Sequence, residues 1–451
     1  MKFFGVKHIE DVAGMYNYAR VMYCLANFLR HAYWDRDKLL AYRDKKTRAV
    51  VKYAYEHSRF YHDSFKKLGL RPDDIRNVKD LNKLPIFRRS ELQKNIDNII
   101  SDEFDREKLE VDKTSGSSGQ PLFVYLSKKE SEFRKAKMLR ANVSCGQRIR
   151  DRWLVITAPS HLSRGNLFQR IFGFFYPFSI SVFEDTTQQL SIIRDFRPDV
   201  IEGYSSVLFL MAKELEKSGI DVPNARLIIG GADFIDEPSR EFVERMFSAP
   251  FFDQYASVEL EAMAWQCVEK GGYHIDADSV VMQFVDEEGE EVAPGERGEI
   301  VCTSLFNYAM PFIRYAIGDI GVFSDDECSC GRVFPVMKMI EGRKDSFMRF
   351  SNGRILSPRS FTITMSMFSQ YDRIDRFRII QKSNNVVEVV LKLKEGVKDE
   401  ESLASSLEAH MRKMLKFEDS TVDILVRFTD DIALSRGGKL NAVVSYCKSS
   451  E

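Results

Sequence analysis

Hydrophobic residues return along the chain with two periods, one helical and one strand-like. From Met15 to about Trp34 they recur at helical spacing, and the stretch RAVVKYAYEHSRFYHDSFKKLG predicts a second helix that ends at Gly69. Further on, strand-like runs such as RWLVITAP and ARLIIGGA alternate with helical runs such as SSVLFLMAKELEKSG. This alternation predicts a parallel sheet flanked by helices, with binding sites at the carboxyl ends of its strands.

The pattern changes twice toward the C-terminus. Between about residues 280 and 344, short strands and turns such as GERGEIVCTSL predict a β-rich part. After Asp345, the stretch FRIIQKSNNVVEVVLKLK predicts a hairpin, followed by a helix around Glu400 to Leu415 and the strand TVDILVRF. We therefore predict an α/β protein with a large domain over residues 1–344, which begins with a helical cap over about residues 1–80. A small, mobile α+β lid is predicted over residues 345–451.

Composition narrows the classes of function. The 451 residues include 66 Lys and Arg against 67 Asp and Glu, and this balance argues against a general binder of nucleic acid or anionic membranes. The first residues lack the apolar core of a secretory signal, and no window reaches the roughly 18 apolar residues of a membrane span. We expect a cytoplasmic protein whose seven cysteines form no disulfide framework. The most apolar run, Ile171 to Phe183, is predicted to be a buried strand or a pocket wall.

A run of small polar residues lies between two predicted strands, LEVDK and PLFVYLS. Its glycines permit turn conformations, and its hydroxyls and backbone N–H groups can bind an anion such as a phosphate. The alternative is an ordinary surface turn, and no Gly-Lys-Ser/Thr sequence follows that would mark a Walker loop. The candidate phosphate-binding residues are Thr114, Ser115, Gly116, Ser117, Ser118 and Gly119.

Five more short stretches follow in a defined order: IIGGADF, DQYASVE, RYAIGDIG, EGRKDSF and SRGGKLNA. Each is weak by itself, but together with the serine-rich loop they resemble the core motifs of the adenylate-forming enzymes, the superfamily of acyl-CoA synthetases, adenylation domains and luciferases. The stretches VVKYAYEHSRFYHDSF and KDLNKLPIFRRSEL are similar to the N-terminal part of its phenylacetate-CoA ligase branch. That branch includes capsule-biosynthesis-type relatives and synthetases that adenylylate a deazaflavin coenzyme.

The resemblance implies an AMP-forming ligase that activates a carboxylic acid, aryl or related, with ATP and transfers it to coenzyme A. Lys439, on the small domain, would neutralise charge between the carboxylate and the α-phosphate, and Glu259 would hold Mg²⁺. Asp345 would be the hinge of the small domain. The other implied nucleotide contacts are the phosphate loop Thr114–Gly119, Gly231, Ala232 and Tyr255 at the adenine, Ala256 and Ser257 beside them, Asp319 at the ribose, and Arg343.

Two departures from the family pattern keep alternatives open. Val258 stands where the family usually has a hydroxyl residue near the α-phosphate, and Ile317 stands where it usually has Thr. One alternative transfers AMP to a cofactor hydroxyl or loads a carrier protein, and a second is a non-catalytic nucleotide-binding descendant. The sequence also allows a homodimer.

A second group of residues has the composition of a metal site. Cys267 and His274 lie seven residues apart, and Cys328 and Cys330 lie two apart before Gly331, which permits a tight turn. Three thiolates and one imidazole match a closed tetrahedral set for structural Zn²⁺. The alternative is that Cys267 belongs to the core and the Cys-x-Cys pair is accidental. Similar Cys/His sets occur in the family that the chain resembles, which favours zinc.

Overall fold

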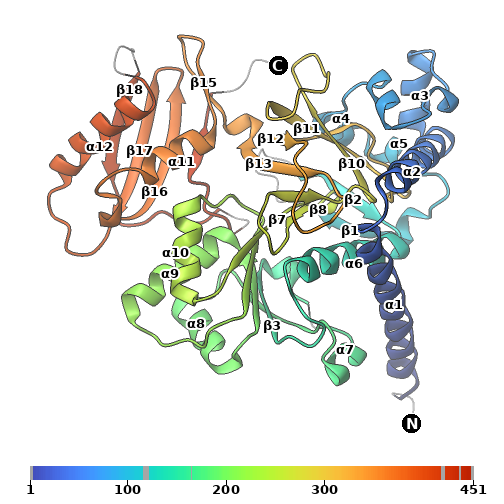
Figure 1. The fold of residues 1–451 in the computed structure, drawn as a ribbon, viewed down its shortest axis with the longest axis horizontal. Helices are drawn as coiled ribbons and strands as arrows, with labels where there is room; N and C mark the ends of the chain where they lie inside the picture. Colours follow the sequence, from blue (N-terminus) through green and yellow to red (C-terminus); the bar gives the residue numbers. More distant parts are fainter. Residues whose placement is uncertain (1–3, 115–120, 164, 418–421, 436–437, 448–451) are drawn as a thin grey trace.

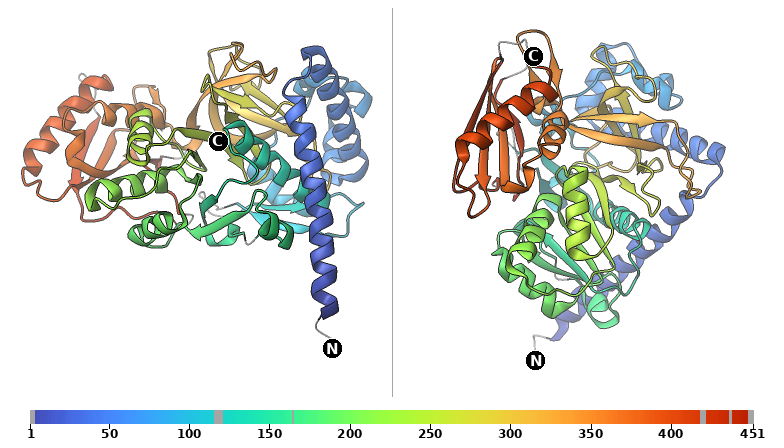
Figure 2. Two further views of the ribbon diagram at one scale, coloured as in Figure 1. Left: turned by 60° about the horizontal axis from the view of Figure 1, so that its bottom comes forward. Right: turned by 60° about the vertical axis from the view of Figure 1, so that its left-hand side comes forward.

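The computed structural model describes residues 4–114, 121–163, 165–417, 422–435 and 438–447. Helices form the N-terminal part: α1 Phe4–His31, α2 Arg36–His57, α3 Arg59–Lys67, α4 Arg89–Lys94 and α5 Ile96–Ile99. Helix α1 runs along one side of the molecule and extends beyond its body (Figures 1 and 2). No helix among the described residues combines the length and the apolar character needed to cross a membrane.

The predicted second helix is interrupted at Ser58. This residue has an extended backbone, with φ −123° and ψ 113°, so that α2 and α3 are separate helices. The Ser58 hydroxyl donates a hydrogen bond to the carbonyl of Asn98, 3.1 Å away, and the side chain is buried. The hydroxyl therefore bonds to a segment forty residues away, and this tertiary contact accompanies a break that hydrophobic periodicity did not indicate.

The α/β class predicted from the sequence is confirmed, and both parts of the large unit share strands in one sheet (Figure 1). Within the described residues the sheet has eleven strands in the order β10-β11-β12-β13-β9-β8-β7-β6-β5-β3-β4. Strand β7 pairs in parallel with β6 and antiparallel with β8, so it joins the two halves. The parallel half is β3 Trp153–Thr157, β4 Pro177–Ser181, β5 Val200–Tyr204, β6 Leu227–Gly231 and β7 Phe251–Ser257.

The antiparallel half follows β7 along the chain. Its strands are β8 Glu261–Gln266, β9 Tyr273–Ile275, β10 Val280–Val285, β11 Arg297–Ser304, β12 Tyr315–Ser324 and β13 Val336–Arg343. The helices around the sheet are α6 Lys128–Ser144, α7 Leu167–Phe172, α8 Thr186–Phe196, α9 Ser205–Ser218 and α10 Glu237–Phe247. A separate hairpin pairs β1 Glu110–Lys113 with β2 Phe123–Leu126, as the two strand-like runs around the serine-rich loop predict.

The prediction of a buried strand over Ile171 to Phe183 is wrong in its first part. Ile171 and Phe172 end the exposed helix α7 and are 65% and 48% exposed. The chain then turns through Gly173 and enters β4, where only part of the run is buried. The apolar character of a short run does not distinguish a strand from a helix, and here α7 begins at a capping box formed by Asn166 and Gln169.

Residues after Asp345 pack around an apolar core of their own, in which Phe361, Ile379 and Leu407 are fully buried. The sheet order is β18-β17-β16-β19, and α11 and α12 lie beside it (Figure 1). The predicted hairpin is present, with a turn between Ser383 and Val386. The elements of this C-terminal part are η5 Lys344–Ser346, β14 Met348–Arg349, β15 Ile355–Leu356, α11 Pro358–Ser366, β16 Ile374–Ser383, β17 Val386–Leu393, α12 Glu400–Met414, β18 Asp423–Phe428 and β19 Val443–Ser445. We refer to residues 345–451 as the small domain.

Candidate active site and Cys/His group

Lys439 lies where the small domain meets the parallel half of the large sheet. The next residue, Leu440, donates its backbone N–H to Oγ of Ser206 over 3.2 Å. The Lys439 Nζ atom lies 5.9 Å from the ring centroid of Tyr204, the last residue of β5. Burial lowers the pKa of Lys439, while the carboxylates of Asp233 and Asp319 act in the opposite direction. The predicted catalytic lysine is therefore half-buried and within the electrostatic influence of acidic groups of the large domain.

Asp319, Tyr255 and Arg343 form one hydrogen-bonded group at the junction of the two halves of the sheet. The Tyr255 hydroxyl donates to Oδ2 of Asp319 over 2.7 Å, and Arg343 Nε lies 3.2 Å from Oδ1. Burial raises the pKa of Asp319, and the Asp319 carboxylate raises the pKa of Arg343. Ile317 is buried in the core, and its carbonyl accepts a hydrogen bond from Arg343. Ile317 therefore packs where the family usually has a hydroxyl side chain.

The end of strand β6 supplies the predicted adenine contacts. Gly231 is its last residue, and Ala232 has a left-handed backbone with φ +68°. The following Asp233 accepts hydrogen bonds from the backbone N–H and the hydroxyl of Ser206. Burial raises the pKa of Asp233 to about 6, against the effect of these hydrogen bonds and of Lys439. Asp233 therefore links this strand end to the Lys439 region.

Glu259 and Thr114 are joined through a residue that the motifs did not indicate, Arg89. The arginine donates from Nη2 to the Thr114 hydroxyl, and its Nη1 lies 3.9 Å from Oε1 of Glu259. Tyr315 also donates its hydroxyl to Oε1 of Glu259 over 2.8 Å. The structure thus brings the start of the predicted phosphate loop close to the predicted magnesium ligand. Ser115, Gly116, Ser117, Ser118 and Gly119 lie outside the described residues.

The segment between Tyr255 and Glu259 shows how the hydroxyl of Ser257 is used. It accepts a hydrogen bond from the backbone N–H of Leu260 over 3.1 Å, which closes the turn between β7 and β8. Ala256 is exposed, and Val258 packs partly buried against the apolar core. This contact uses one acceptor lone pair of the Ser257 hydroxyl, and Val258 offers no hydroxyl where the family usually has one.

Sequence reasoning did not indicate Arg89, Tyr315, Ser206 or Asp233 as site residues. Asp233 directly follows the Gly-Gly-Ala stretch and could have been included by its position there. Arg89 is the second of two adjacent arginines and begins the short helix α4, and Ser206 is one of two adjacent serines. Nothing in those patterns separates the residue that reaches the site from its neighbour.

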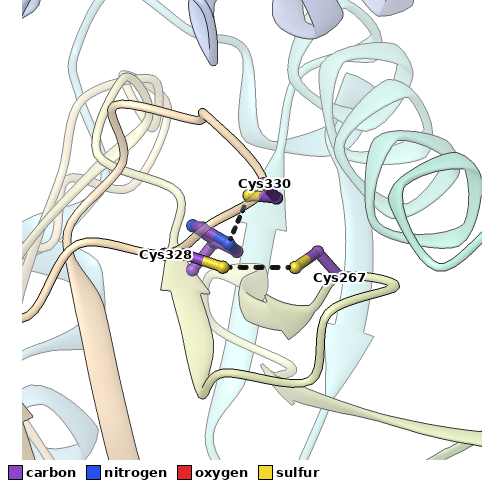
Figure 3. A group of neighbouring side chains, drawn as sticks. Cys267, Cys328 and Cys330 are labelled. Carbon is purple, nitrogen blue, oxygen red and sulfur yellow. Dashed lines mark hydrogen bonds between the residues drawn. The ribbon is translucent and has the colours of Figure 1, made fainter.

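The four predicted metal ligands meet at one place beside strands β8 and β9. The ligand atoms of Cys267, His274, Cys328 and Cys330 all lie within 4.8 Å of one another. The Sγ atoms of Cys267 and Cys328 are 3.6 Å apart, with Cys330 beside them (Figure 3). Cys330 Sγ lies 3.3 Å from His274 Nε2. Thiolates bound to one tetrahedral zinc at about 2.3 Å stand roughly 3.8 Å apart, so the spacing fits that ion.

A glycine turn and hydrogen bonds to neighbouring residues hold the four side chains of this Cys/His group in place. Gly331 has φ +74°, a left-handed conformation that favours glycine, so the turn expected after Cys330 is present. His274 Nδ1 lies 3.4 Å from the carbonyl of Phe334, which orients the ring so that Nε2 faces the thiols. The adjacent Trp265 donates to buried Asp276, which is ion-paired with Arg140 of α6. This network connects the Cys/His group to the core of the large domain.

Known proteins confirm the resemblance inferred from the motifs. No protein-family model matches the chain. It is 30% identical over 306 residues to a phenylacetate-coenzyme A ligase of Aromatoleum evansii, covering 63% of this chain and 67% of the relative. It is 27% identical over 324 residues to the enzyme of the same name from Thermus thermophilus, covering 69% of this chain and 72% of that one. Protein CapK of Staphylococcus aureus is 21% identical over 428 residues, covering 91% of this chain and 90% of CapK.

Solved structures share the fold over most of the chain. A 2-hydroxyisobutyryl-CoA ligase in the postadenylation state has a TM-score of 0.73 and 17% identity, and covers 91% of this chain and 90% of its own. The same ligase in the thioesterification state has a TM-score of 0.61 and 17% identity, and the match covers 92% of this chain and 91% of the ligase chain. The fold and the order of the site residues define an adenylate-forming enzyme. Within that class, the chain belongs to the phenylacetate-coenzyme A ligase family and is an acid-CoA ligase.

Proposed function

We propose that the protein activates an aryl or related carboxylic acid with ATP and then transfers the acyl group from the acyl-adenylate to coenzyme A. The observation that carries this proposal is the docking of the turn around Lys439 on Ser206 of the large domain, where the ammonium feels the charges of Asp319 and Arg343. Formation of an acyl-adenylate needs a cation beside the bound nucleotide, where negative charge develops as pyrophosphate leaves. Lys439 would supply that cation.

Each half of the large sheet contributes a different part of the nucleotide site. The edge formed by Gly231, Ala232 and Tyr255 would receive the adenine, and Asp319 would accept hydrogen bonds from the ribose hydroxyls. The loop that starts at Thr114 would bind the β- and γ-phosphates, with Arg89 beside it. Glu259 offers the carboxylate oxygen that Mg²⁺ prefers, and the ion when bound would neutralise phosphate charge. Arg89 and Tyr315 orient that carboxylate from the protein side.

In the first step a carboxylate oxygen of the acid bonds to the α-phosphorus while the bond to pyrophosphate breaks. Lys439 would stand between the carboxylate and the α-phosphate and stabilise the negative charge as it shifts to the leaving group. In the second step the thiol sulfur of coenzyme A bonds to the acyl carbon, AMP leaves with the carboxyl oxygen, and the thiol proton passes to solvent. The small domain would rotate near Asp345, an exposed residue in η5, between the two steps.

The aryl class of the acid and the coenzyme A acceptor rest on the relatives named phenylacetate-coenzyme A ligase. The alternative products are AMP transferred to a cofactor hydroxyl and an acyl group loaded on a carrier protein. Val258, which lacks the usual hydroxyl, is the observation that favours a non-catalytic nucleotide-binding protein instead.

A single assay separates these functions. The protein is incubated with ATP, Mg²⁺ and each member of a panel of aryl, arylacetic and aliphatic acids, with and without coenzyme A. The ligase predicts acid-dependent pyrophosphate release and a thioester identified by mass spectrometry. If pyrophosphate is released but no acid gives a thioester, coenzyme A is not the acceptor, and AMP transfer or carrier loading is favoured. No pyrophosphate with any acid, together with tight ATP binding, identifies the non-catalytic protein.

We also propose that the Cys/His group binds one structural Zn²⁺. Three thiols and one imidazole nitrogen supply four soft or borderline ligands at tetrahedral spacing, and such a set leaves no open position for substrate. The ion would fix the segment around Cys328 and Cys330 against β8 and β9. It takes no part in either chemical step.

A further inference from the structure

The turn that carries Lys439 rests on a specific seat in the large domain. The seat consists of Ser206 at the first turn of α9, Asp233 after β6, and Val182 after β4. Ser206 donates its hydroxyl to Asp233 and accepts the backbone N–H of Leu440 over 3.2 Å. Since Asp233 also accepts the Ser206 backbone N–H over 3.1 Å, the serine is held at two points, and one of the two lone pairs of its hydroxyl accepts the N–H of the turn.

The other side of the turn requires a residue without a side chain. Gly438 has φ +78°, and a Cβ atom built there would lie 2.6 Å from Cγ2 and 3.4 Å from Cβ of Val182. Val182 is buried, so it has little room to move aside. Gly396, also in the small domain, has φ +90° but would meet no atom within 4 Å. Replacing either glycine with alanine would therefore strain the backbone, but only the substitution at Gly438 would also clash with Val182.

From these contacts we propose that Ser206, held by Asp233, is a positioning residue that docks Lys439 for acyl-adenylate formation, and that Gly438 is what allows the turn to seat against Val182. The role rests on the proposed function, because it assigns the seat to the first chemical step. It goes beyond that function by naming which contacts stabilise the adenylation arrangement. The seat has no part in thioester formation, for which the small domain must leave it.

A measurement without substrate tests docking independently of activity. Reductive methylation of the intact protein is followed by mass spectrometry, and modification of Lys439 is compared with that of exposed Lys398 in the same sample. Loss of one hydrogen bond should speed Lys439 modification about fivefold in Ser206→Ala. Gly438→Ala should speed it at least as much. Ser218→Ala, an exposed serine of the same helix, and Gly396→Ala are the matched controls and should match the parent. Equal Lys439 rates in all variants overturn the proposal.

The half-reactions give the second readout. Single-turnover pyrophosphate release with phenylacetate or the best acid of the panel should slow about fivefold or more in Ser206→Ala. Thioester formation from supplied acyl-adenylate and coenzyme A should stay within about twofold of the parent. Adding Val182→Ala to Gly438→Ala should restore much of the first rate, because it removes the closest contact. The proposed docking role is contradicted if Ser206→Ala slows both half-reactions equally. It is also contradicted if Val182→Ala does not restore pyrophosphate release in Gly438→Ala. A parent protein inactive with every acid refutes the proposed function, while the methylation result still decides whether the turn docks on Ser206.

Discussion

The Tyr255 hydroxyl donates a hydrogen bond to Oδ2 of Asp319 over 2.7 Å, so the residue predicted to stack on adenine also orients the residue predicted to bind ribose. Burial raises the pKa of Asp319, and this hydrogen bond lowers it. Removal of the hydroxyl should therefore raise the pKa of Asp319 further. Ribose binding needs the ionised carboxylate and should weaken as pH falls through that pKa.

Tyr255→Phe consequently makes ATP binding more sensitive to acid. We expect the KM for ATP to change little at the alkaline end of the profile and to rise about threefold or more relative to the parent toward its acid end. The phenyl ring retains the stacking surface, so kcat should be nearly unchanged at the alkaline end. KM profiles of parent and variant against pH check the expectation, and parallel profiles would show that the hydrogen bond does not tune Asp319.

Lys439→Ala should cripple adenylation and leave nucleotide binding largely intact. Loss of one preorganised charge at a transition state typically costs about a hundredfold or more in rate. Single-turnover pyrophosphate release measures the first effect, and calorimetric titration with ATP measures the second. Lys398→Ala changes an exposed lysine of the same domain and serves as control. If Lys439→Ala forms the acyl-adenylate at the parental rate, the lysine has no catalytic role in this step.

Arg89→Met should raise the KM for ATP about tenfold, because the guanidinium lies between Thr114 and Glu259 and we expect it to make a charge-assisted contact with phosphate. Lys94→Met, an exposed cation at the end of the same helix α4, should leave KM near its parental value. Steady-state kinetics with varied ATP test the pair. A similar small effect in both variants would mean that only the general charge of this surface matters.

Metal analysis of the purified protein should find one zinc per chain. Cys330→Ser and His274→Ala should each lower that content and the melting temperature, since a bound ion would hold the segment after Cys328. Cys447→Ser, which changes a cysteine outside the group, should change neither. X-ray absorption should give Zn–S distances of about 2.3 Å. Full zinc content in Cys330→Ser would exclude this set of ligands.

Glu202 gives stability a defined pH dependence. Its carboxylate accepts hydrogen bonds from Asn142 and Trp153, but burial dominates and raises the pKa from 4.5 to about 7. The unfolded state loses its proton first as pH rises above 4.5, so this contribution favours folding at low pH and is lost toward pH 7. Glu202→Gln should therefore show a smaller decline in Tm between pH 5 and pH 8 than the parent, measured by thermal unfolding. A parallel decline would contradict the assigned pKa.

Sequence patterns predicted those features that depend on local chemistry. Strand and helix alternation predicted the α/β class, and residue type together with the family resemblance pointed to Cys267, His274, Cys328 and Cys330, which the fold brings together. The break at Ser58 depends on a hydrogen bond to Asn98, forty residues away, which no local pattern contains. Arg89 and Ser206 were missed for the same reason. Their partners Glu259 and Leu440 come from distant parts of the chain, and only the tertiary arrangement distinguishes them from their neighbours.

The position of Lys439 also bears on how the two halves of the large sheet behave as one body. Leu440 is bonded to Ser206 beside the parallel half, while the Lys439 ammonium feels the charges of Asp319 and Arg343 from the antiparallel half. The turn therefore has contacts or charge interactions with both halves, on either side of the junction strand β7. Under the proposed rotation of the small domain, both kinds of interaction would be lost in one movement. The large sheet would then have to hold its two halves together without the turn, through the pairing of β7 with β6 and β8.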